Sequence, residues 1–391
     1  MHLHCVHLHS SLPNNDGWNF RSTARSLTLR CDSDSLITTL TSPAGIEQRW
    51  TDPLAALDWM AAHPGSDPTS RWVGYLSYDL GRLFEPLPAT ATDDLHLPLF
   101  CFSRHEKEHA TDIKIGTGAI CSVPVELQST MPRAVYLQRA ATAIDYIRAG
   151  DVFQVNLAQR FTAPLTIPAR QVWQNLITRT PAAYGVYLDC GDHSLISNSP
   201  ELFLRITQDR RVITRPIKGT RPFIPGMHED LLHSPKDQAE LNMIIDLERN
   251  DFGRVCEIGS VRVTQPRTIE AHPTVYHGVA TIEGKLNPDV TFVDLLRAVF
   301  PGGSITGAPK IRAMQIIEEL EPVRRGPYCG AIGYIAADGT MQFNVAIRTI
   351  IVKDDQAYIP VGGGIVADSD PLEEYEETIT KAAAMFRALD L

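Results

Sequence analysis

The chain has 391 residues, of which 43% are hydrophobic and 21% charged, a composition typical of a globular protein with a large core. Lys plus Arg is 36 and Asp plus Glu is 46, so the formal charge of −10 argues against non-specific binding to nucleic acid. No apolar stretch is long enough to span a membrane, so no membrane partner is expected.

Cysteine usage indicates the compartment. The seven cysteines contain no CxxC pair and are scattered over positions 5, 31, 101, 121, 190, 256 and 329. An odd number without such a pair fits reduced thiols in the cytoplasm better than a disulfide framework. The N-terminus has no basic region followed by an apolar one, so we recognise no secretory signal and expect a cytoplasmic protein.

Residues 1–70 have the weakest pattern, and we take them as an N-terminal segment of the same fold. Their opening run, from Met1 to His9, alternates histidine with leucine and valine. This alternation predicts a strand with one polar face, and a metal site is the weaker alternative.

From residue 71 onward, strands alternate with helices. Residues 71–78 predict a strand, residues 85–98 a surface loop, and residues 133–149 an amphipathic helix that Gly150 ends. The following segments predict a strand over 151–161, a helix over 170–180, two strands within 184–207 and a strand over 212–216.

The second half continues in the same way. Helices are predicted over 235–246, 289–299 and 372–389, with another opened by Pro309, and strands over 254–264, 275–284, 328–337, 341–352 and 356–362. The last three strands are expected to be antiparallel neighbours. Many strands with interspersed helices predict an α+β fold or an α/β sandwich, and a TIM barrel is the alternative.

The most informative segment is Phe300–Met314, with the sequence FPGGSITGAPKIRAM. Its glycine-rich half carries the hydroxyls of Ser304 and Thr306, and Lys310 follows at the predicted start of a helix. Free N–H groups and the positive end of a helix dipole favour an anion there. A tight turn that needs three glycines is the alternative, and the spacing of a P-loop is absent.

This segment resembles the FPGGSITGAPKxRAM block of the chorismate-utilising enzymes, specifically of the subunits that aminate chorismate. The resemblance covers roughly residues 72–390 and is also carried by SPELF at 199–203, PIKGT at 216–220, AELNMIIDLERND at 239–251 and EEYEET at 373–378. It implies two packed antiparallel sheets with outer helices, as in anthranilate synthase component I. Residues 71–391 would then be a chorismate-binding catalytic domain.

Two acidic segments suggest a metal site. Glu240 lies among apolar residues, and Glu374 and Glu377 are three apart on one helix face, where like charges are destabilising without a cation. Mg²⁺ suits a few carboxylates plus water and a substrate oxygen, whereas a solvated helix face is the alternative. The resemblance implies that these three glutamates hold Mg²⁺, which would clamp the ring carboxylate of chorismate.

The resemblance also implies two catalytic groups. Glu201 would be the general acid that protonates the departing C4 hydroxyl, because hydroxide is a poor leaving group. Lys218 stands where anthranilate synthases carry alanine, whereas aminodeoxychorismate synthases carry the same PIKGT sequence. Lys218 would attack chorismate at C2, after which ammonia adds at C4 and expels the lysine.

Other residues are expected to bind substrate. The resemblance implies that His277, as a third catalytic residue, lies near the ring and the enolpyruvyl arm, and that Tyr328 and Arg348 clamp the enolpyruvyl carboxylate. A structural histidine is the alternative for His277. Further contacts are expected from Thr306, Gly307, Gly362, Gly363, Gly364 and Lys381. Gln154 stands where water-using relatives carry a lysine, which favours ammonia as the nucleophile.

Together these features imply a transferase of the transaminase type that aminates chorismate at C4, giving 4-amino-4-deoxychorismate for 4-aminobenzoate and folate synthesis. The chain shows no nucleophilic-cysteine elbow, so ammonia would come from a separate glutamine amidotransferase subunit (component II), and a lyase would later release pyruvate. The alternatives are anthranilate synthase component I and a non-catalytic homologue that acts as a binding subunit.

Overall fold

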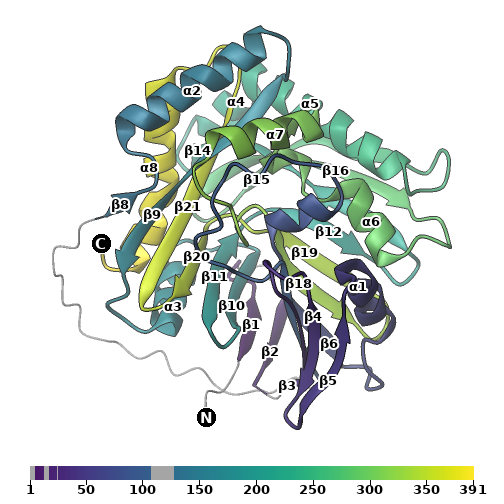
Figure 1. Ribbon diagram of the computed structural model, residues 1–391. Coiled ribbons are helices and arrows are strands. Elements are labelled where there is room, and N and C mark those ends of the chain that lie inside the picture. The colour runs from purple at the N-terminus through teal and green to yellow at the C-terminus, as the bar shows by residue number, and fades with distance from the viewer. Residues whose placement is uncertain (1–4, 13–16, 24, 107–126) are drawn as a thin grey trace.

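A computed structural model describes residues 5–12, 17–23, 25–106 and 127–391. Its strands form two sheets in which neighbouring strands are antiparallel, and helices lie on the outer faces (Figure 1). The predicted α+β sandwich is confirmed. The TIM-barrel alternative is wrong, because a TIM barrel needs parallel strands.

The first sheet has nine strands among the described residues. Their order is β17 (Gly307–Ala308), β9 (Gln154–Pro164), β21 (Gln356–Ile365), β20 (Thr349–Lys353), β11 (His193–Ser199), β10 (Tyr184–Asp189), β1 (Val6–His9) and β2 (Asn19–Ser22), with β8 (Gln128–Ser129) paired to β9.

The second sheet has twelve strands in the same part of the chain. Their order is β14 (Ile217–Pro222), β16 (Val275–Lys285), β13 (Arg211–Arg215), β12 (Leu202–Ile206), β19 (Met341–Val345), β18 (Ala331–Ala336), β6 (Arg71–Leu76), β7 (Phe100–His105), β3 (Arg25–Cys31), β4 (Thr38–Ser42) and β5 (Gly45–Trp50), with β15 (Arg262–Ala271) paired to β16.

The helices begin and end at residues suited to those positions. They are α1 (Pro53–Ala62), α2 (Arg133–Arg148), α3 (Ala169–Arg179), α4 (Met227–Leu232), α5 (Pro235–Gly253), α6 (Phe292–Val299), α7 (Lys310–Leu320) and α8 (Pro371–Ala388), with 3₁₀ turns η1 (Tyr78–Leu83) and η2 (Gly303–Ile305). The Ser234 hydroxyl caps α5 and the Asp370 carboxylate caps α8, each followed by a proline in the first turn.

The core lies in layers. Between the sheets, Val186 and Leu195 of the first sheet pack with Val73 and Ile332 of the second. On the outer face of the first sheet, α3 and α8 cover the strands, and on the outer face of the second, α1, α5 and α6 do so. α2 and α7 pack together against β9. Sheets and helices therefore bury one another as a sandwich.

The N-terminal segment contributes strands to both sheets. β1 and β2 join the first sheet at β10, and β3, β4 and β5 extend the second beyond β7. The strand predicted for the opening run is confirmed over Val6–His9, while His2 and His4 lie outside the described residues. The strands β2 to β5 are short and alternate weakly, and the sequence did not predict them.

One segment predicted as a single strand is two strands in different sheets. Over 341–352 the chain forms β19 in the second sheet, leaves it, and enters the first sheet as β20. Arg348, at the break, has a positive φ of 49°. The antiparallel arrangement expected for 328–362 therefore holds for β18 with β19 and for β20 with β21, but not between β19 and β20.

Two other boundaries differ from expectation. Helix α5 continues to Gly253 rather than ending at residue 246, and the strand expected over 254–264 starts only at Arg262. Residues 184–207 form three strands rather than two, since β12 follows β11 in the other sheet.

Candidate active site

The predicted site residues come from elements of both sheets and two helices. The chain crosses between sheets twice at the same place, from β11 to β12 and from β19 to β20 (Figure 1). The two crossings are hydrogen-bonded to each other: Val345 N donates to Glu201 O at 3.1 Å, and Asn198 N donates to Arg348 O at 3.1 Å. Glu201 and Arg348 are thereby fixed beside one another.

Glu201 is a buried carboxyl, only 4% exposed. Burial raises its pKa to about 7, although a hydrogen bond with the Ser304 side chain and the positive charges of Lys218 and Lys381 oppose that rise. A carboxyl with such a pKa is partly protonated near neutral pH, so it can donate a proton. Ser304 was noted in the sequence, but its contact with this acid was not predicted.

Lys218 lies in an irregular part of β14. The pairing of β14 with β16 shifts register between Ile217 and Thr220, and such a bulge redirects the side chain from the regular ladder. Gly278 permits the close approach, because a Cβ there would lie 2.5 Å from the Lys218 carbonyl oxygen.

The ammonium group of Lys218 lies close to acids. Its Nζ is 3.9 Å from Glu240 Oε2, and the Lys218 side chain is 11% exposed. Burial lowers the pKa of Lys218, although Glu240 and Glu201 favour its charged form. Loss of a proton from this lysine is therefore easier than in water.

A second acidic group comes from α8. Lys381 Nζ lies 2.6 Å from Glu377 Oε1 and donates to Gly362 O at 3.0 Å. Burial and the neighbouring charge of Glu377 raise the pKa of Glu374, although the Ser369 hydroxyl donates to Glu374 Oε1 at 2.6 Å. Partial desolvation disfavours ionised Glu377, whose side chain is 51% exposed, but the charges of Lys381 and other lysines outweigh it and lower the pKa of Glu377.

The two carboxylates of α8 converge on Gly363 of β21. A Cβ at Gly363 would lie 3.3 Å from Glu374 Oε2 and 3.6 Å from both Glu377 Oε1 and Lys381 Nζ. The absence of a side chain at Gly363 therefore leaves the space in front of these charges open.

The acidic residues suit a hard cation. Glu374 and Glu377 supply carboxylate oxygens on one helix face, and Glu240 faces the same lysine that Glu377 influences. Within the part of the chain that the structure describes, only Asp34, Asp93 and His96 bring three potential ligand atoms within 4.8 Å of one another. Those three residues lie near the surface. The oxygen atoms of Glu240, Glu374 and Glu377 are of the type that a hard cation prefers, but they do not all lie within 4.8 Å of one another.

His277 is a buried neutral histidine. It is 2% exposed, and its Nδ1 shares a hydrogen bond of 2.9 Å with Thr220 Oγ1. Burial, and then the positive charges of Arg348 and His272, lower its pKa well below the usual value. The structure therefore brings His277 close to Arg348 and keeps its imidazole uncharged.

Arg348 is a desolvated cation. Burial lowers its pKa, and among the described residues no carboxylate forms an ion pair with it. A half-buried guanidinium without a counter-charge is favourable for an anionic ligand. Tyr328 is 4% exposed, and the following residue, Cys329, joins the segment that precedes Arg348, because its N–H donates to Ala346 O at 2.9 Å.

The glycine-rich segment differs from an open anion loop. The Thr306 hydroxyl donates to Gly302 O at 2.9 Å inside the loop, and Gly307, with φ of 141°, packs directly on the backbone of Gln154. Lys310 Nζ donates to Val299 O at 2.9 Å, directly before the loop, and forms an ion pair with Asp251 at 2.5 Å. Polar groups of this segment therefore mainly hold its own shape.

Strand β21 has one free edge next to the site. Gly362, Gly363 and Gly364 pair with β9, whereas the register of β20 with β21 covers only residues 356–358. Gly364 lies against the Gln154 side chain, where a Cβ would collide with its amide. Gln154 is 2% exposed, and neither polar atom of its amide has a hydrogen-bond partner among the described residues.

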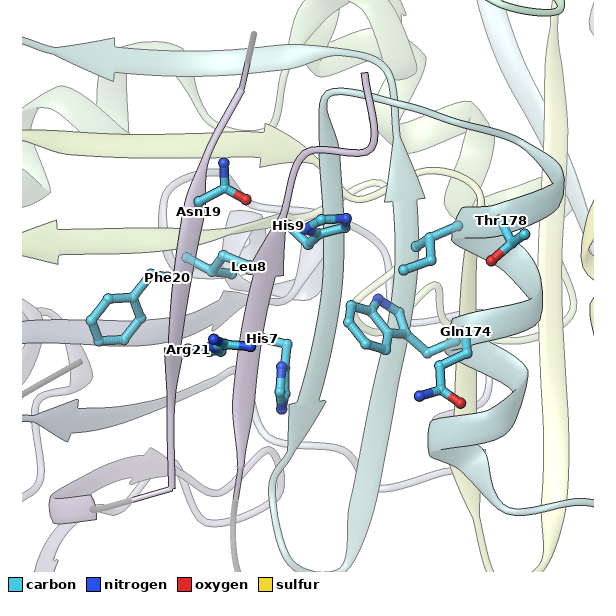
Figure 2. Close-up of a pocket in the computed structure, with 10 residues that line it drawn as sticks. His7, Leu8, His9, Asn19, Phe20, Arg21, Gln174 and Thr178 are labelled. Atoms are coloured by element: carbon cyan, nitrogen blue, oxygen red, sulfur yellow. The ribbon is translucent and has the colours of Figure 1, made fainter. Parts of the chain in front are cut away.

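A cavity of about 410 Å³ lies elsewhere, between α3 and the strands β1 and β2 (Figure 2). His7 and His9 face it, and their rings contact Trp173 at centroid distances of 5.3 and 6.3 Å. Burial and the charges of Arg170 and Arg21 lower the pKa of His7 to about 4. None of the predicted site residues lines this cavity.

Comparison with known proteins identifies the family. A model of the family described as chorismate binding enzyme matches residues 121–387. Anthranilate synthase component 1 of Thermus thermophilus is 42% identical over 357 residues, covering 82% of this chain and 77% of that protein. Aminodeoxychorismate synthase component 1 of Escherichia coli K12 is 39% identical over 347 residues, covering 81% and 76%.

A solved structure agrees with this assignment. Anthranilate synthase component I from Streptococcus pneumoniae TIGR4 superposes with a TM-score of 0.81 at 30% identity, covering 98% of this chain and 92% of that one. The chain therefore belongs to the chorismate binding enzymes and is a chorismate-utilising enzyme. No helix among the described residues is long and apolar enough to cross a membrane.

Proposed function

We propose that this protein aminates chorismate at C4 with ammonia and releases 4-amino-4-deoxychorismate, acting as an aminodeoxychorismate synthase component I. The observation that carries the proposal is the position of Lys218, a buried lysine whose Nζ lies 3.9 Å from Glu240 Oε2 and whose charge interacts with Glu201. A lysine that can lose its proton in this setting is a nucleophile for C2.

Proton transfer in this reaction would use the paired groups. Lys218 adds to C2 as the C4 hydroxyl leaves, and Glu201 gives that oxygen its proton so that water, not hydroxide, departs. Ammonia then forms the bond to C4, and the bond between lysine and C2 breaks. The charges of these two groups interact, so each favours the charged form of the other.

The anionic arms of the substrate would be bound by cations on both sides. Arg348, with Tyr328 and neutral His277 beside it, suits the enolpyruvyl carboxylate. Glu240, Glu374 and Glu377 would hold Mg²⁺, which when bound would offset the charge of the ring carboxylate. Lys381, which donates a hydrogen bond to Gly362 O, would lie close to the ring carboxylate of the substrate.

The unpartnered amide of Gln154 supports ammonia as the nucleophile. A buried amide without hydrogen bonds is costly unless a ligand completes it, and ammonia can both donate to Oε1 and accept from Nε2. Relatives are named component 1, so we propose that a glutamine amidotransferase subunit supplies the ammonia. A separate lyase would then release pyruvate from the product.

A product assay tests this proposal. Purified protein is mixed with chorismate, Mg²⁺ and ammonium, with and without added aminodeoxychorismate lyase, and products are identified by mass spectrometry. We expect aminodeoxychorismate, converted to 4-aminobenzoate only when the lyase is present. Anthranilate formed without any lyase would instead establish the second candidate, anthranilate synthase, which relatives of 42% identity and the solved structure favour.

Two variants of Lys218 separate nucleophile from counter-charge. Lys218→Ala should lower the rate of C4 amination by about 10³-fold or more and permit some anthranilate, because the covalent step is lost. Lys218→Arg keeps the charge beside Glu240 but cannot act as a nucleophile, so it should be equally inactive at C4. Near-normal rates in the arginine variant would mean that the lysine acts only through its charge.

A further inference from the structure

A second group of reactive side chains lies between the two sheets, at the end of β10 and β11 away from the active site. It contains the thiols of Cys101 and Cys190: Cys190 packs against the buried apolar cluster that includes Cys101, and the two thiols are within hydrogen-bonding reach of each other. Cys101 is in β7 of the second sheet and Cys190 follows β10 of the first sheet. The pair therefore bridges the two layers of the sandwich.

The register of the second sheet explains the position of Cys101. In that sheet Arg30, Cys101 and Tyr75 are directly opposite one another on β3, β7 and β6, so their side chains form one row on the same face. Tyr75 and Cys101 belong to the core between the sheets, which places this face of the row toward the first sheet.

The hairpin turn of the first sheet supplies a matching set. Cys190 N donates to His193 O at 2.9 Å across the turn, so Cys190 and His193 are also neighbours. Asp192 binds Arg30 with both carboxylate oxygens, at 2.7 and 2.6 Å, and His193 Nε2 contacts the Tyr75 hydroxyl at 3.0 Å. Contacts on both sides therefore hold Cys190 against Cys101.

We propose that Cys101 and Cys190 are a site of reversible oxidation, at which hydrogen peroxide converts the two thiols to a disulfide that joins the sheets. The Cys101 thiolate attacks one peroxide oxygen, the O–O bond breaks, and the departing oxygen leaves as water after taking a proton. The Cys190 thiol then attacks the resulting sulfenic sulfur and a second water leaves. Two thiols lose two electrons and two protons in total, and the peroxide is reduced.

The surroundings assign different roles to the two sulfurs. The hydrogen bond from Cys190 and then the charge of Arg30 lower the pKa of Cys101, despite its burial. The same hydrogen bond raises the pKa of Cys190, which remains a thiol and is the more exposed of the two. Attack by Cys101 and resolution by Cys190 follow from this difference.

The test is peptide mapping of the full-length protein after hydrogen peroxide treatment. Free thiols are alkylated, the protein is digested without reductant, and disulfide-linked peptides are identified by mass spectrometry. We expect one linked pair containing Cys101 and Cys190, which disappears on reduction. Cys31 is an internal control, because it neighbours this row along β3 but packs in the core on the other face of the sheet, and it should remain alkylated.

The bond should also change stability. It closes a loop of about 90 residues, so the midpoint of thermal unfolding should rise by about 5 °C in the oxidised protein. Cys190→Ser should abolish both the linked peptide and the shift, and Cys101→Ser should do the same. If either variant is poorly folded, the proximity of the two thiols can be measured with phenylarsine oxide, which binds pairs of neighbouring thiols. We expect one molecule to bind per chain of the reduced wild type and to protect both thiols from alkylation.

Three results would contradict a disulfide between Cys101 and Cys190. Separate oxidation of Cys101 and Cys190 to sulfinic acids without a linked peptide would overturn the proposal. A disulfide from either of them to another cysteine, or a shift that persists in Cys190→Ser, would overturn it as well.

Discussion

Glu201 owes its chemistry to its place at a sheet crossing. The turn between β11 and β12 buries its carboxyl, and burial raises the pKa to about 7. Neighbouring lysines keep that rise moderate, so the group can both hold and release a proton near neutral pH. Exposed on a helix, the same glutamate would be ionised and unable to donate.

This position predicts a pH dependence. The protonated carboxyl is the proposed acid, so kcat/KM for the proposed C4 amination should fall as pH rises through about 7. A pH–rate profile from 5.5 to 9 measures this fall in kcat/KM. Glu201→Gln should lower the rate strongly and should abolish the fall with pH. A profile that is flat across this range in the wild type would show that another group supplies the proton.

At the scale of elements, several side chains hold the segments of the site together. Arg325 donates to both carboxylate oxygens of Glu321, to Ile305 O at 3.0 Å and to Asn156 O at 2.8 Å. Glu321 also accepts from Ala158 N at 2.9 Å. One buried ion pair thereby connects the end of α7, the 3₁₀ turn η2 and strand β9.

Truncation of this arginine should affect both stability and catalysis. Arg325→Ala leaves a buried carboxylate unpaired, which costs about 3 kcal/mol of unfolding free energy. Arg325→Lys keeps the charge but cannot reach both backbone carbonyls, so it should fold while kcat falls about tenfold. Denaturant unfolding and steady-state kinetics measure the two effects, and full activity in a folded lysine variant would exclude a positioning role.

Helix α5 carries a buried carboxyl that the proposed chemistry does not use. Glu248 accepts from Thr214 Oγ1 at 3.1 Å, and burial, then the charges of Glu201 and Asp251, raise its pKa to about 8. The unfolded chain ionises near pH 4.5, while the folded protein keeps this proton until about pH 8. Stability is therefore lost as pH rises between these values.

Glu248→Gln should remove that loss. The unfolding free energy of the variant minus that of the wild type should be about 3 kcal/mol larger at pH 8 than at pH 5. Thermal or urea unfolding at the two pH values measures it. An equal effect of the substitution at both values would mean that Glu248 ionises in the folded protein as it does in the unfolded chain.

For the whole molecule, substrate and metal binding should be visible as stability. Mg²⁺ with chorismate at 100 times the dissociation constant should add about 2.7 kcal/mol. Glu377→Gln and Glu374→Gln should reduce the Mg²⁺-dependent part of this gain, measured as the shift in thermal midpoint. Glu373→Gln, an exposed neighbour on the same helix, is the matched control and should keep it. No shift in the wild type would favour the non-catalytic alternative.

The sequence predicted the sandwich, and it offered candidate site residues because several motifs are contiguous in the chain. It did not predict that 341–352 changes sheets at Arg348, because a run of apolar residues looks the same within one strand or across two. The link through Arg325 was also missed, since a charged pair at helical spacing usually indicates a solvated face. Both depend on contacts distant in the chain.

The sheet pairings join parts of the chain that are synthesised far apart in time. β1 pairs with β10, β6 with β18 and β9 with β21, so most of the two layers depends on non-local contacts, which form slowly. The glycines of β21 and the acidic residues of α8 come last. Glu374 and Glu377 follow every strand of both sheets in the chain, so the proposed metal ligands of α8 would be added only after the residues of the sheets have been synthesised.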